Sequence, residues 1–209
     1  MIGRNTPNLD EFWTGRGLWN PMGESMCKSI LGIVGSPRRG GNTEILVDEI
    51  LAGAAETGAL TNKTILNELE ISPCQACNIC HETGRCVQQD DMMTLLENMQ
   101  QSQVWVLGTP IYWWGPSAQL KMFIDRWYGI KRDTFNGRLV ILAIPMGGGH
   151  PRYARHTVGI LTDILDYLGM ELIETVLAPG AHSLGAVRRH TDIMSKARQS
   201  GRKAIEQLK

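Results

Sequence analysis

The sequence predicts an α/β protein built on a five-stranded, doubly wound parallel sheet with helices on both faces. Short apolar runs alternate along the chain with segments whose apolar residues recur at helical spacing, a pattern typical of βαβ units joined by right-handed crossovers. Three of the loops that follow these runs are rich in glycine, hydroxyl groups or aromatic rings. In a doubly wound sheet such loops meet at the carboxyl ends of the strands, where ligands bind.

The first βα unit is clearly marked. Residues 29–34, SILGIV, form a short apolar segment, as expected of a strand covered on both faces. The loop 35–43, GSPRRGGNT, follows, and Thr43 is the expected N-cap of a helix that ends before Gly58. The inward face of this helix is expected to consist of Leu46, Val47, Ile50, Leu51 and Ala54.

The second strand is predicted at residues 63–71, KTILNELEI, where apolar and polar residues alternate. This weaker pattern indicates a position near the edge of the sheet. A cysteine-rich segment follows, and Asp90 or Asp91 is the expected N-cap of the next helix. Residues 103–108, QVWVLG, are then expected to form the third strand.

The rest of the chain continues the alternation of helices and strands. Asn136-Gly137 marks a turn, and Gly169 is placed to stop a helix. The expected elements are a helix at 117–128, a strand at 138–144, a helix at 153–168, a strand at 171–177 and a polar helix from about Asp192 to the C-terminus.

Composition bounds the class of protein. Lys plus Arg and Asp plus Glu both number 21, so the net charge gives no support for nucleic-acid binding. No apolar run approaches the roughly 20 residues that span a bilayer, and Met1–Ser25 does not resemble a signal peptide. We therefore expect a cytoplasmic protein that binds small molecules, with no nucleic-acid or membrane partner.

The chain divides into an arm and one domain. Residues 1–27 carry Trp13 and Trp19 among polar residues, without a strand or helix period, and are expected to form an N-terminal arm. Residues 28–209 are expected to form a single domain with a cysteine-rich loop at 73–90.

The loop 35–43 has the composition of a phosphate site. It is not a nucleotide-triphosphate loop, because that pattern requires Lys where Gly41 stands, and it does not match the G-x-G-x-x-G fingerprint. A strand that leads through such a turn into a helix points backbone N–H groups at an anion. Two readings remain: a site for one terminal phosphate, or a tight turn with two solvated arginines. The groups available are Ser36, Asn42, Thr43, Arg38 and Arg39.

Two further loops could hold a flat ring. Tyr112, Trp113 and Trp114 are consecutive between Pro110 and Pro116, and such aromatics can form a wall beside a ring system. They could equally pack under the loop or at a subunit contact. The glycines at 147–149 have no side chains, so a planar ligand could approach their backbone closely, although glycines also simply make turns.

The cysteine segment has the spacing C-x2-C-x2-C-x5-C, formed by Cys74, Cys77, Cys80 and Cys86. Four thiolates so close in sequence can surround one 4Fe-4S cluster, because a cluster accepts short irregular loops between its ligands. The same sulfurs could hold zinc, or they could be free reduced thiols.

These motifs together resemble a known family. GSPRRGGNTEIL, TPIYWWGPSAQLKMFIDRW and PMGGG, in that order and spacing, resemble the FMN-binding loops of the flavodoxin-like NAD(P)H-dependent FMN reductases. The cysteines make the chain most similar to the iron-sulfur flavoprotein branch. The resemblance covers about residues 28–208 and implies a flavodoxin-like sheet with strand order 2-1-3-4-5.

The resemblance also implies the site residues. The FMN phosphate would be bound by Ser36, Arg38, Asn42 and Thr43. The isoalloxazine would lie along Pro110, Ile111, Tyr112, Trp113, Trp114 and Gly115, and its pyrimidine edge would contact Met146, Gly147, Gly148 and Gly149. A 4Fe-4S cluster would be held by Cys74, Cys77, Cys80 and Cys86.

The implied activity is oxidation of NAD(P)H, or of a protein donor, with electrons passed to a quinone, a small electrophile or an electron carrier. No side chain is expected to act as nucleophile or general base, because flavin N5 carries the chemistry. The family implies a homodimer or homotetramer. The competing reading is a non-enzymatic electron carrier resembling a flavodoxin, and the balanced charge of this chain speaks against it.

Overall fold

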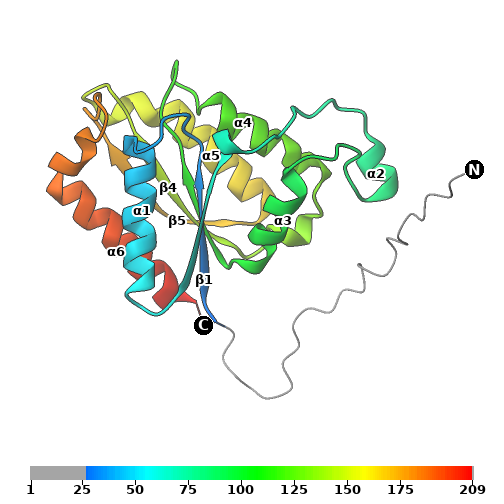
Figure 1. Ribbon diagram of the computed structural model, residues 1–209, viewed down its shortest axis with the longest axis horizontal. Coiled ribbons are helices and arrows are strands. Elements are labelled where there is room, and N and C mark those ends of the chain that lie inside the picture. Colours follow the sequence, from blue (N-terminus) through cyan, green and yellow to red (C-terminus); the bar gives the residue numbers. More distant parts are fainter. Residues whose placement is uncertain (1–26, 209) are drawn as a thin grey trace, which may run out of the picture.

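The computed structural model describes residues 27–208, so the arm expected at residues 1–27 lies outside the described residues except for Cys27, which is exposed. The described chain forms one five-stranded parallel sheet in the order β2-β1-β3-β4-β5, which confirms the predicted topology (Figure 1). The strands are β1 Ser29–Val34, β2 Leu60–Ile65, β3 Val104–Gly108, β4 Leu139–Pro145 and β5 Glu171–Ala178.

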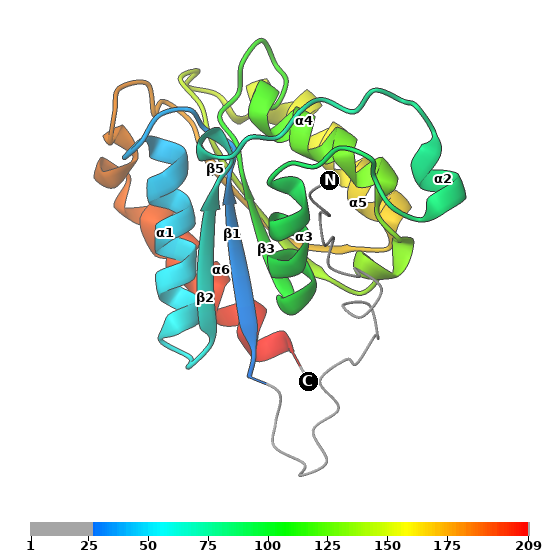
Figure 2. The same ribbon diagram turned by 45° about the vertical axis from the view of Figure 1, so that its right-hand side comes forward.

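Helices cover both faces of the sheet, as Figures 1 and 2 show. One face carries α1 Asn42–Ala55 and α6 Thr191–Gln207, and the other carries α3 Met92–Gln101, α4 Ala118–Asp125 and α5 Arg155–Leu168. The core is accordingly divided by the sheet: Ile30 and Val34 pack toward α1, whereas Leu31 and Ile33 pack toward α3 and α4. This alternation explains why β1 is apolar throughout.

The second strand differs from its prediction at both ends. Strand β2 runs from Leu60 to Ile65 and is followed by a 3-10 turn, Leu66–Glu68, rather than by further strand to residue 71. Within residues 27–208 its only neighbouring strand is β1, with which it pairs from Ser29↔Leu60 to Val34↔Ile65, so the pairing ends where β1 ends. Leu66 and Ile71 are buried because they pack in the core, not because they continue the strand.

Two predicted helix termini also need correction, and a third is confirmed. Gly41, not Thr43, occupies the N-cap position of α1, and Thr43 is buried within the first turn. The start of α3 agrees with its prediction: Asp91 occupies the N-cap position, with its carboxylate accepting the N–H of Glu70, and the Asp90 carboxylate accepts the N–H of Met92 at 3.2 Å. Helix α4 ends at Asp125 and is followed by a 3-10 turn, Arg126–Gly129, because the chain there turns Trp127 into the core.

The cysteine-rich loop carries an element that the sequence did not predict. A short helix, α2 Ile79–Thr83, lies between Cys77 and Cys86 and projects from the body of the molecule (Figures 1 and 2). Within residues 27–208, none of the helices has the length and apolar character needed to cross a bilayer.

Candidate active site

The loops after β1, β3 and β4 meet at the carboxyl edge of the sheet. Gly35 donates its N–H to the carbonyl of Gly108 at 2.7 Å, and the Ser117 hydroxyl donates to the carbonyl of Gly35. Thr109 donates its N–H to the carbonyl of Ala143 at 3.0 Å. These bonds join the first loop to the aromatic loop and hold the start of the aromatic loop against β4, whose end carries the glycine loop.

The first loop is held in place before any ligand is considered. Ser36 is buried, and its hydroxyl accepts the N–H of Arg38 at 3.2 Å. Gly40 has a φ of +62° and donates its N–H to the carboxylate of Glu44 at 2.7 Å. Since glycine reaches this backbone conformation at little cost, Gly40 suits the turn. Arg38 stays exposed.

Glu44 sets the charge distribution behind this loop. Its carboxylate pairs with Arg39 at 3.1 Å and with Lys63 at 2.9 Å, and its side chain is only 9% exposed. Burial by itself raises the pKa of Glu44, but hydrogen bonds from Lys63 and from the Gly40 N–H, together with the charges of Lys63 and Arg39, hold that pKa below its usual value. Because Arg39 is paired, Arg38 is the arginine of this loop that faces solvent without an ion pair in the described chain.

Asn42 connects the first loop to the segment after β5. Its amide nitrogen donates to the carbonyls of Ala181 at 2.9 Å and Ser183 at 2.8 Å, and its amide oxygen accepts the N–H of Val187 at 3.1 Å. Both amide N–H groups are thus engaged with the chain itself. Direct contact between Asn42 and a phosphate stays a prediction, and it would require at least one of these bonds to be exchanged.

The aromatic loop is a tight two-residue turn. Tyr112 and Gly115 exchange two backbone hydrogen bonds of 3.0 Å, and Trp113 and Trp114 between them have φ values of +50° and +64°. Non-glycine residues rarely adopt this left-handed conformation, and turns of this kind ordinarily use Asn-Gly. Thr157 on α5 donates its hydroxyl to the Trp114 carbonyl at 2.9 Å, which ties the turn to a helix. Trp113 is 92% exposed at the tip.

A cavity of about 400 Å³ opens between the aromatic loop and the glycine loop. This volume lies in the usual range for small-molecule sites. Of the predicted ring-binding residues, Pro110, Tyr112 and Gly115 belong to the loop but do not line the cavity. The lining consists of Ile111, Trp113, Trp114, Met146, Gly147, Gly148, Gly149 and Tyr153.

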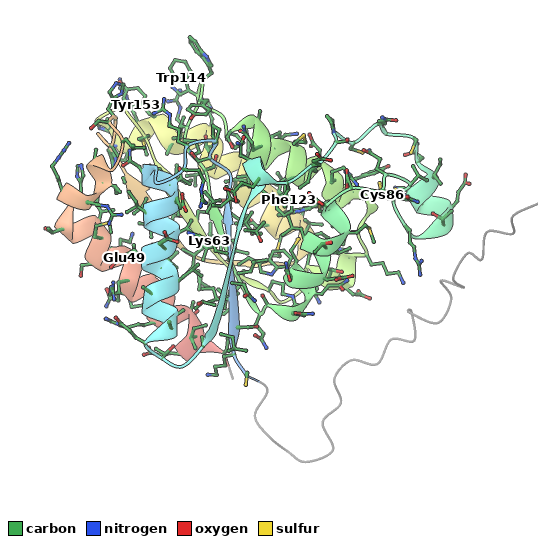
Figure 3. The ribbon with its side chains drawn as sticks, in the orientation of Figure 1. Glu49, Lys63, Cys86, Trp114, Phe123 and Tyr153 are labelled. Carbon is green, nitrogen blue, oxygen red and sulfur yellow. The ribbon has the colours of Figure 1, made fainter. Side chains whose placement is uncertain are left out.

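The backbone of the glycine loop lies close to the side chains of Tyr153 and His182. A Cβ atom added to Gly148 would lie 2.6 Å from Cδ2 of Tyr153, and one added to Gly147 would lie 3.0 Å from Nδ1 of His182. Neither residue was predicted as part of the site: Tyr153 was expected only at the start of a helix, and His182 was assigned no role. An aromatic residue a few positions after a glycine loop, at a helix start, is the signal that could have pointed to Tyr153. In Figure 3, Trp114 and Tyr153 lie at the same end of the molecule.

The sequence of this site decides the family. Residues 29–183 match the family of NADPH-dependent FMN reductases, and this range contains all three loops and the cysteine segment. The chain belongs to this family. The predicted family and its class of enzyme, NAD(P)H-dependent oxidoreductases that contain FMN, are thereby confirmed.

Individual relatives in the family carry related names. An iron-sulfur flavoprotein of Methanocaldococcus jannaschii is 45% identical over 124 residues, which cover 57% of this chain and 64% of that protein. An iron-sulfur flavoprotein of Methanosarcina thermophila is 31% identical over 145 residues, covering 69% of this chain and 76% of that protein. An NAD(P)H-dependent FMN-containing oxidoreductase of Bacillus subtilis, YwqN, is 28% identical, covering 79% and 93%. The match spans less than two thirds of the first of these relatives.

Solved structures agree on the fold. An azoreductase from Bacillus anthracis superposes with a TM-score of 0.67 at 15% identity, covering 84% of this chain and 99% of that one. The Trp repressor binding protein from Bacillus subtilis gives a TM-score of 0.61 at 22% identity, covering 81% and 96%. At such identities the likeness shows the shared architecture alone.

The four clustered cysteines lie away from this cavity, on the loop beside α2 and α3, where Figure 3 labels Cys86. All four are free, and Cys77 is exposed. Within residues 27–208, no three His, Cys, Asp or Glu side chains are close enough together to hold a metal ion. Cys80 and Cys86 do come together on one glycine: a Cβ added to Gly129 would be 3.6 Å from the sulfur of Cys80 and 3.6 Å from Cβ of Cys86.

A buried ion pair anchors the cysteine segment to the end of α4. Asp90 pairs with Arg126, whose side chain is 1% exposed, and also accepts the N–H of Ser72 at 3.0 Å. Burial raises the pKa of Asp90, but the hydrogen bonds from Arg126 and Ser72 outweigh it and lower that pKa below its ordinary value. Asp90 also accepts the N–H of Met92, the first residue of α3, at 3.2 Å, so it fastens the preceding loop and caps the helix start, as expected.

Proposed function

We propose that this chain is an FMN-dependent oxidoreductase that oxidises NAD(P)H and reduces flat small acceptors such as quinones or flavins. The observation that carries the proposal is the cavity of about 400 Å³ between the Trp113-Trp114 turn and the glycine loop. Bound FMN would supply the hydride-transfer chemistry at its N5. The protein's own part is to bind, to orient and to exclude water.

The first loop would bind the FMN phosphate. The Ser36 hydroxyl, the exposed Arg38 guanidinium and the backbone N–H groups at the start of α1 supply hydrogen bonds and positive charge at one place. Gly41 in the N-cap position leaves this helix end without a side-chain cap, so its first N–H groups stay available to an anion.

The other two loops would bind the ring. Trp114 and Ile111 offer an apolar wall, and the glycine loop offers backbone groups with no side chain in the way. Trp113, at the rim, would cover an acceptor or a nicotinamide that stacks on the ring. Because this wall is aromatic and open, it suits many flat molecules and does not select one.

The four cysteines would add an iron-sulfur cluster that carries single electrons. The donor set fits in kind, since four free thiols stand within thirteen residues, from Cys74 to Cys86. Relatives named iron-sulfur flavoproteins support the same reading. Binding by all four would require Cys74 and Cys77 to move toward the pair at Gly129.

The wider setting is part of the same proposal. Residues 28–209 would act as one FMN-binding domain, within a homodimer or homotetramer that completes the open side of the cavity. Clustered free thiols suit a reducing compartment such as the cytoplasm.

An absorption spectrum of anaerobically purified protein tests the cofactors together. We expect flavin bands, FMN release on denaturation, and iron and sulfide in equal amounts. Stopped-flow mixing with NADH and with NADPH should then bleach the flavin, and turnover with a quinone separates an enzyme from an electron carrier. A colourless protein that cannot be reconstituted with FMN would refute the proposal, and zinc without sulfide would refute the cluster alone.

A further inference from the structure

Arg126 contacts the residue before the cysteine-rich loop, the last cysteine of that loop and the loop's final residue. Its Nη1 donates to the carbonyl of Ser72 at 3.0 Å and to the carboxylate of Asp90, and its Nη2 lies 3.4 Å from the sulfur of Cys86. All three partners are distant from Arg126 in sequence. The four clustered cysteines all lie between Ser72 and Asp90 in the sequence. One guanidinium thus fastens both ends of the loop while it faces a sulfur.

The backbone that carries Arg126 is held rigidly. The next residue, Trp127, is buried and packs against Phe123 and Phe135 with ring centroids 5.3 and 5.2 Å away. Because these contacts fix the turn after α4, the guanidinium is presented to the loop from the core and does not depend on the loop for its position. Figure 3 shows Phe123 on the inner side and Cys86 further out.

The same guanidinium has a donor to spare. Nε of Arg126 is buried and has no hydrogen-bond partner within the described chain. Arg126, Cys86 and Gly129 also line a cavity of about 70 Å³, so there is space beside the sulfur. A neutral thiol is a weak acceptor, whereas a metal-bound thiolate or a bridging sulfide carries negative charge and accepts hydrogen bonds well. Buried donors without partners are rare and call for an explanation.

We propose that Arg126 is a positioning residue for the group that the four thiolates hold: it clasps both ends of the cysteine loop and donates hydrogen bonds to sulfur. The proposal rests on the ligand role of Cys74, Cys77, Cys80 and Cys86 put forward above. Hydrogen bonds to sulfur stabilise the more negative, reduced form of an iron-sulfur centre, so their loss shifts its potential in the negative direction.

The chain offers a matched control. Arg138 is a second, partly buried arginine, which donates to the carbonyls of Thr134, Ser102 and Gln100 and to no cysteine. Three full-length variants, Arg126→Met, Arg126→Lys and Arg138→Met, are reconstituted anaerobically with iron and sulfide beside the wild type. Three quantities are measured: the iron retained after gel filtration, the midpoint potential, and the hydrogen exchange of residues 72–90 in the metal-free protein.

We expect Arg126→Met to retain iron about tenfold less tightly, as outer-sphere substitutions do. Its potential should be more negative than that of the wild type, its loop should exchange faster, and Arg126→Lys should fall between the two. Arg138→Met should match the wild type in potential and in loop exchange. If Arg126→Met does not fold, Arg126→Lys decides, since it keeps the charge and loses the forked donors.

The possible failures are distinguishable. An Arg126 variant that keeps the wild-type potential and iron retention overturns the donor role and leaves the cluster proposal standing. A wild type that takes up no iron and sulfide overturns the ligand role of the cysteines, and the donor role with it. In that event the exchange of residues 72–90 decides the clasp, and unchanged exchange in Arg126→Met overturns it as well.

Discussion

The carboxylate of Glu44, in the first turn of helix α1, accepts the N–H of Gly40 at 2.7 Å. This hydrogen bond holds the loop that precedes the helix against the helix itself. The same carboxylate holds Arg39 and Lys63. A buried acid therefore shapes a loop whose expected ligand is itself an anion. This arrangement fixes the loop before the ligand arrives and leaves Arg38 to face it.

Replacing Glu44 by Gln should destabilise the FMN-free protein. The amide can still accept the Gly40 N–H, but it leaves Arg39 and Lys63 without this buried counter-charge, a loss of about 1–3 kcal/mol in the free energy of unfolding. Asp48→Asn is the control, because Asp48 also pairs with Lys63 but is 50% exposed, so we expect a loss below about 1 kcal/mol. Urea unfolding measures both, and equal losses would contradict a special role for Glu44.

The cost of Glu44→Gln should depend on pH in a defined direction. The pKa of Glu44 is lowered in the folded protein, so its contribution is complete above the ordinary value of a glutamate and disappears as the pH falls through the folded-state value. The difference between wild type and variant should be constant above about pH 5 and shrink steadily below about pH 4. Unfolding curves taken across this range check it. If the stability difference between wild type and variant grew on acidification, the pKa of Glu44 would not be lowered by folding.

Asn42→Ala should loosen the segment after β5. The variant loses the hydrogen bonds to Ala181, Ser183 and Val187, and we expect about 2 kcal/mol of lost stability. Hydrogen exchange should rise selectively over residues 181–187. Asn67→Ala is the control, since its amide makes an exposed contact with Gln119. If exchange rises equally throughout the chain, Asn42 does not act as a local clasp.

Strands that are buried on both faces could be predicted from the sequence, because such a strand is apolar along its whole length. Residues 29–34 are apolar, and β1 occupies the same residues because it is covered on both sides. The edge strand was misplaced because Leu66 and Ile71 continue the apolar pattern for the sake of packing, not pairing. Alternation alone does not separate these two causes of burial.

The loops of the site could be predicted from the sequence, but the residues that support these loops through tertiary contacts could not. The sequence positions of Trp114 and the glycine loop pointed to the cavity, because carboxyl ends of parallel strands converge. Tyr153 follows the glycine loop by only four residues, so its position in sequence could have pointed to it, whereas His182 reaches the loop through the segment after β5, which no local pattern encodes. Cysteine spacing likewise indicated ligand chemistry, whereas Arg126 enters through a tertiary contact.

Replacing the two tryptophans of the aromatic turn should stabilise the protein and weaken its binding of flat ligands. Trp113 and Trp114 occupy left-handed backbone positions that cost a bulky residue about 1–2 kcal/mol each. Trp113→Asn combined with Trp114→Gly supplies the residues that such turns prefer, so the FMN-free protein should unfold at a higher temperature. The same variant should lose affinity for FMN or for flat acceptors. Trp113→Phe keeps the strain and the aromatic ring, and should change neither quantity appreciably. A double variant that melts below the wild type would show that the turn is not strained.

Gly148 and Gly149 form a matched pair for testing the crowded side of the cavity. A Cβ added to Gly148 lies 2.6 Å from the Tyr153 ring, whereas no atom of the described residues lies within 4 Å of one added to Gly149. Gly148→Ala should therefore displace the ring and cost about 1–3 kcal/mol of stability, as overpacking does. Gly149→Ala should leave the stability of the FMN-free protein nearly unchanged.

A second substitution separates crowding from other causes. In a Gly148→Ala, Tyr153→Leu protein the added methyl group has room, so stability should recover relative to Gly148→Ala, while Tyr153→Leu alone should lose packing. Thermal unfolding of the four proteins gives the coupling between the two positions. If the effects of the two substitutions simply add, Tyr153 does not support the glycine loop, and its place in the cavity wall has no bearing on how that loop is held.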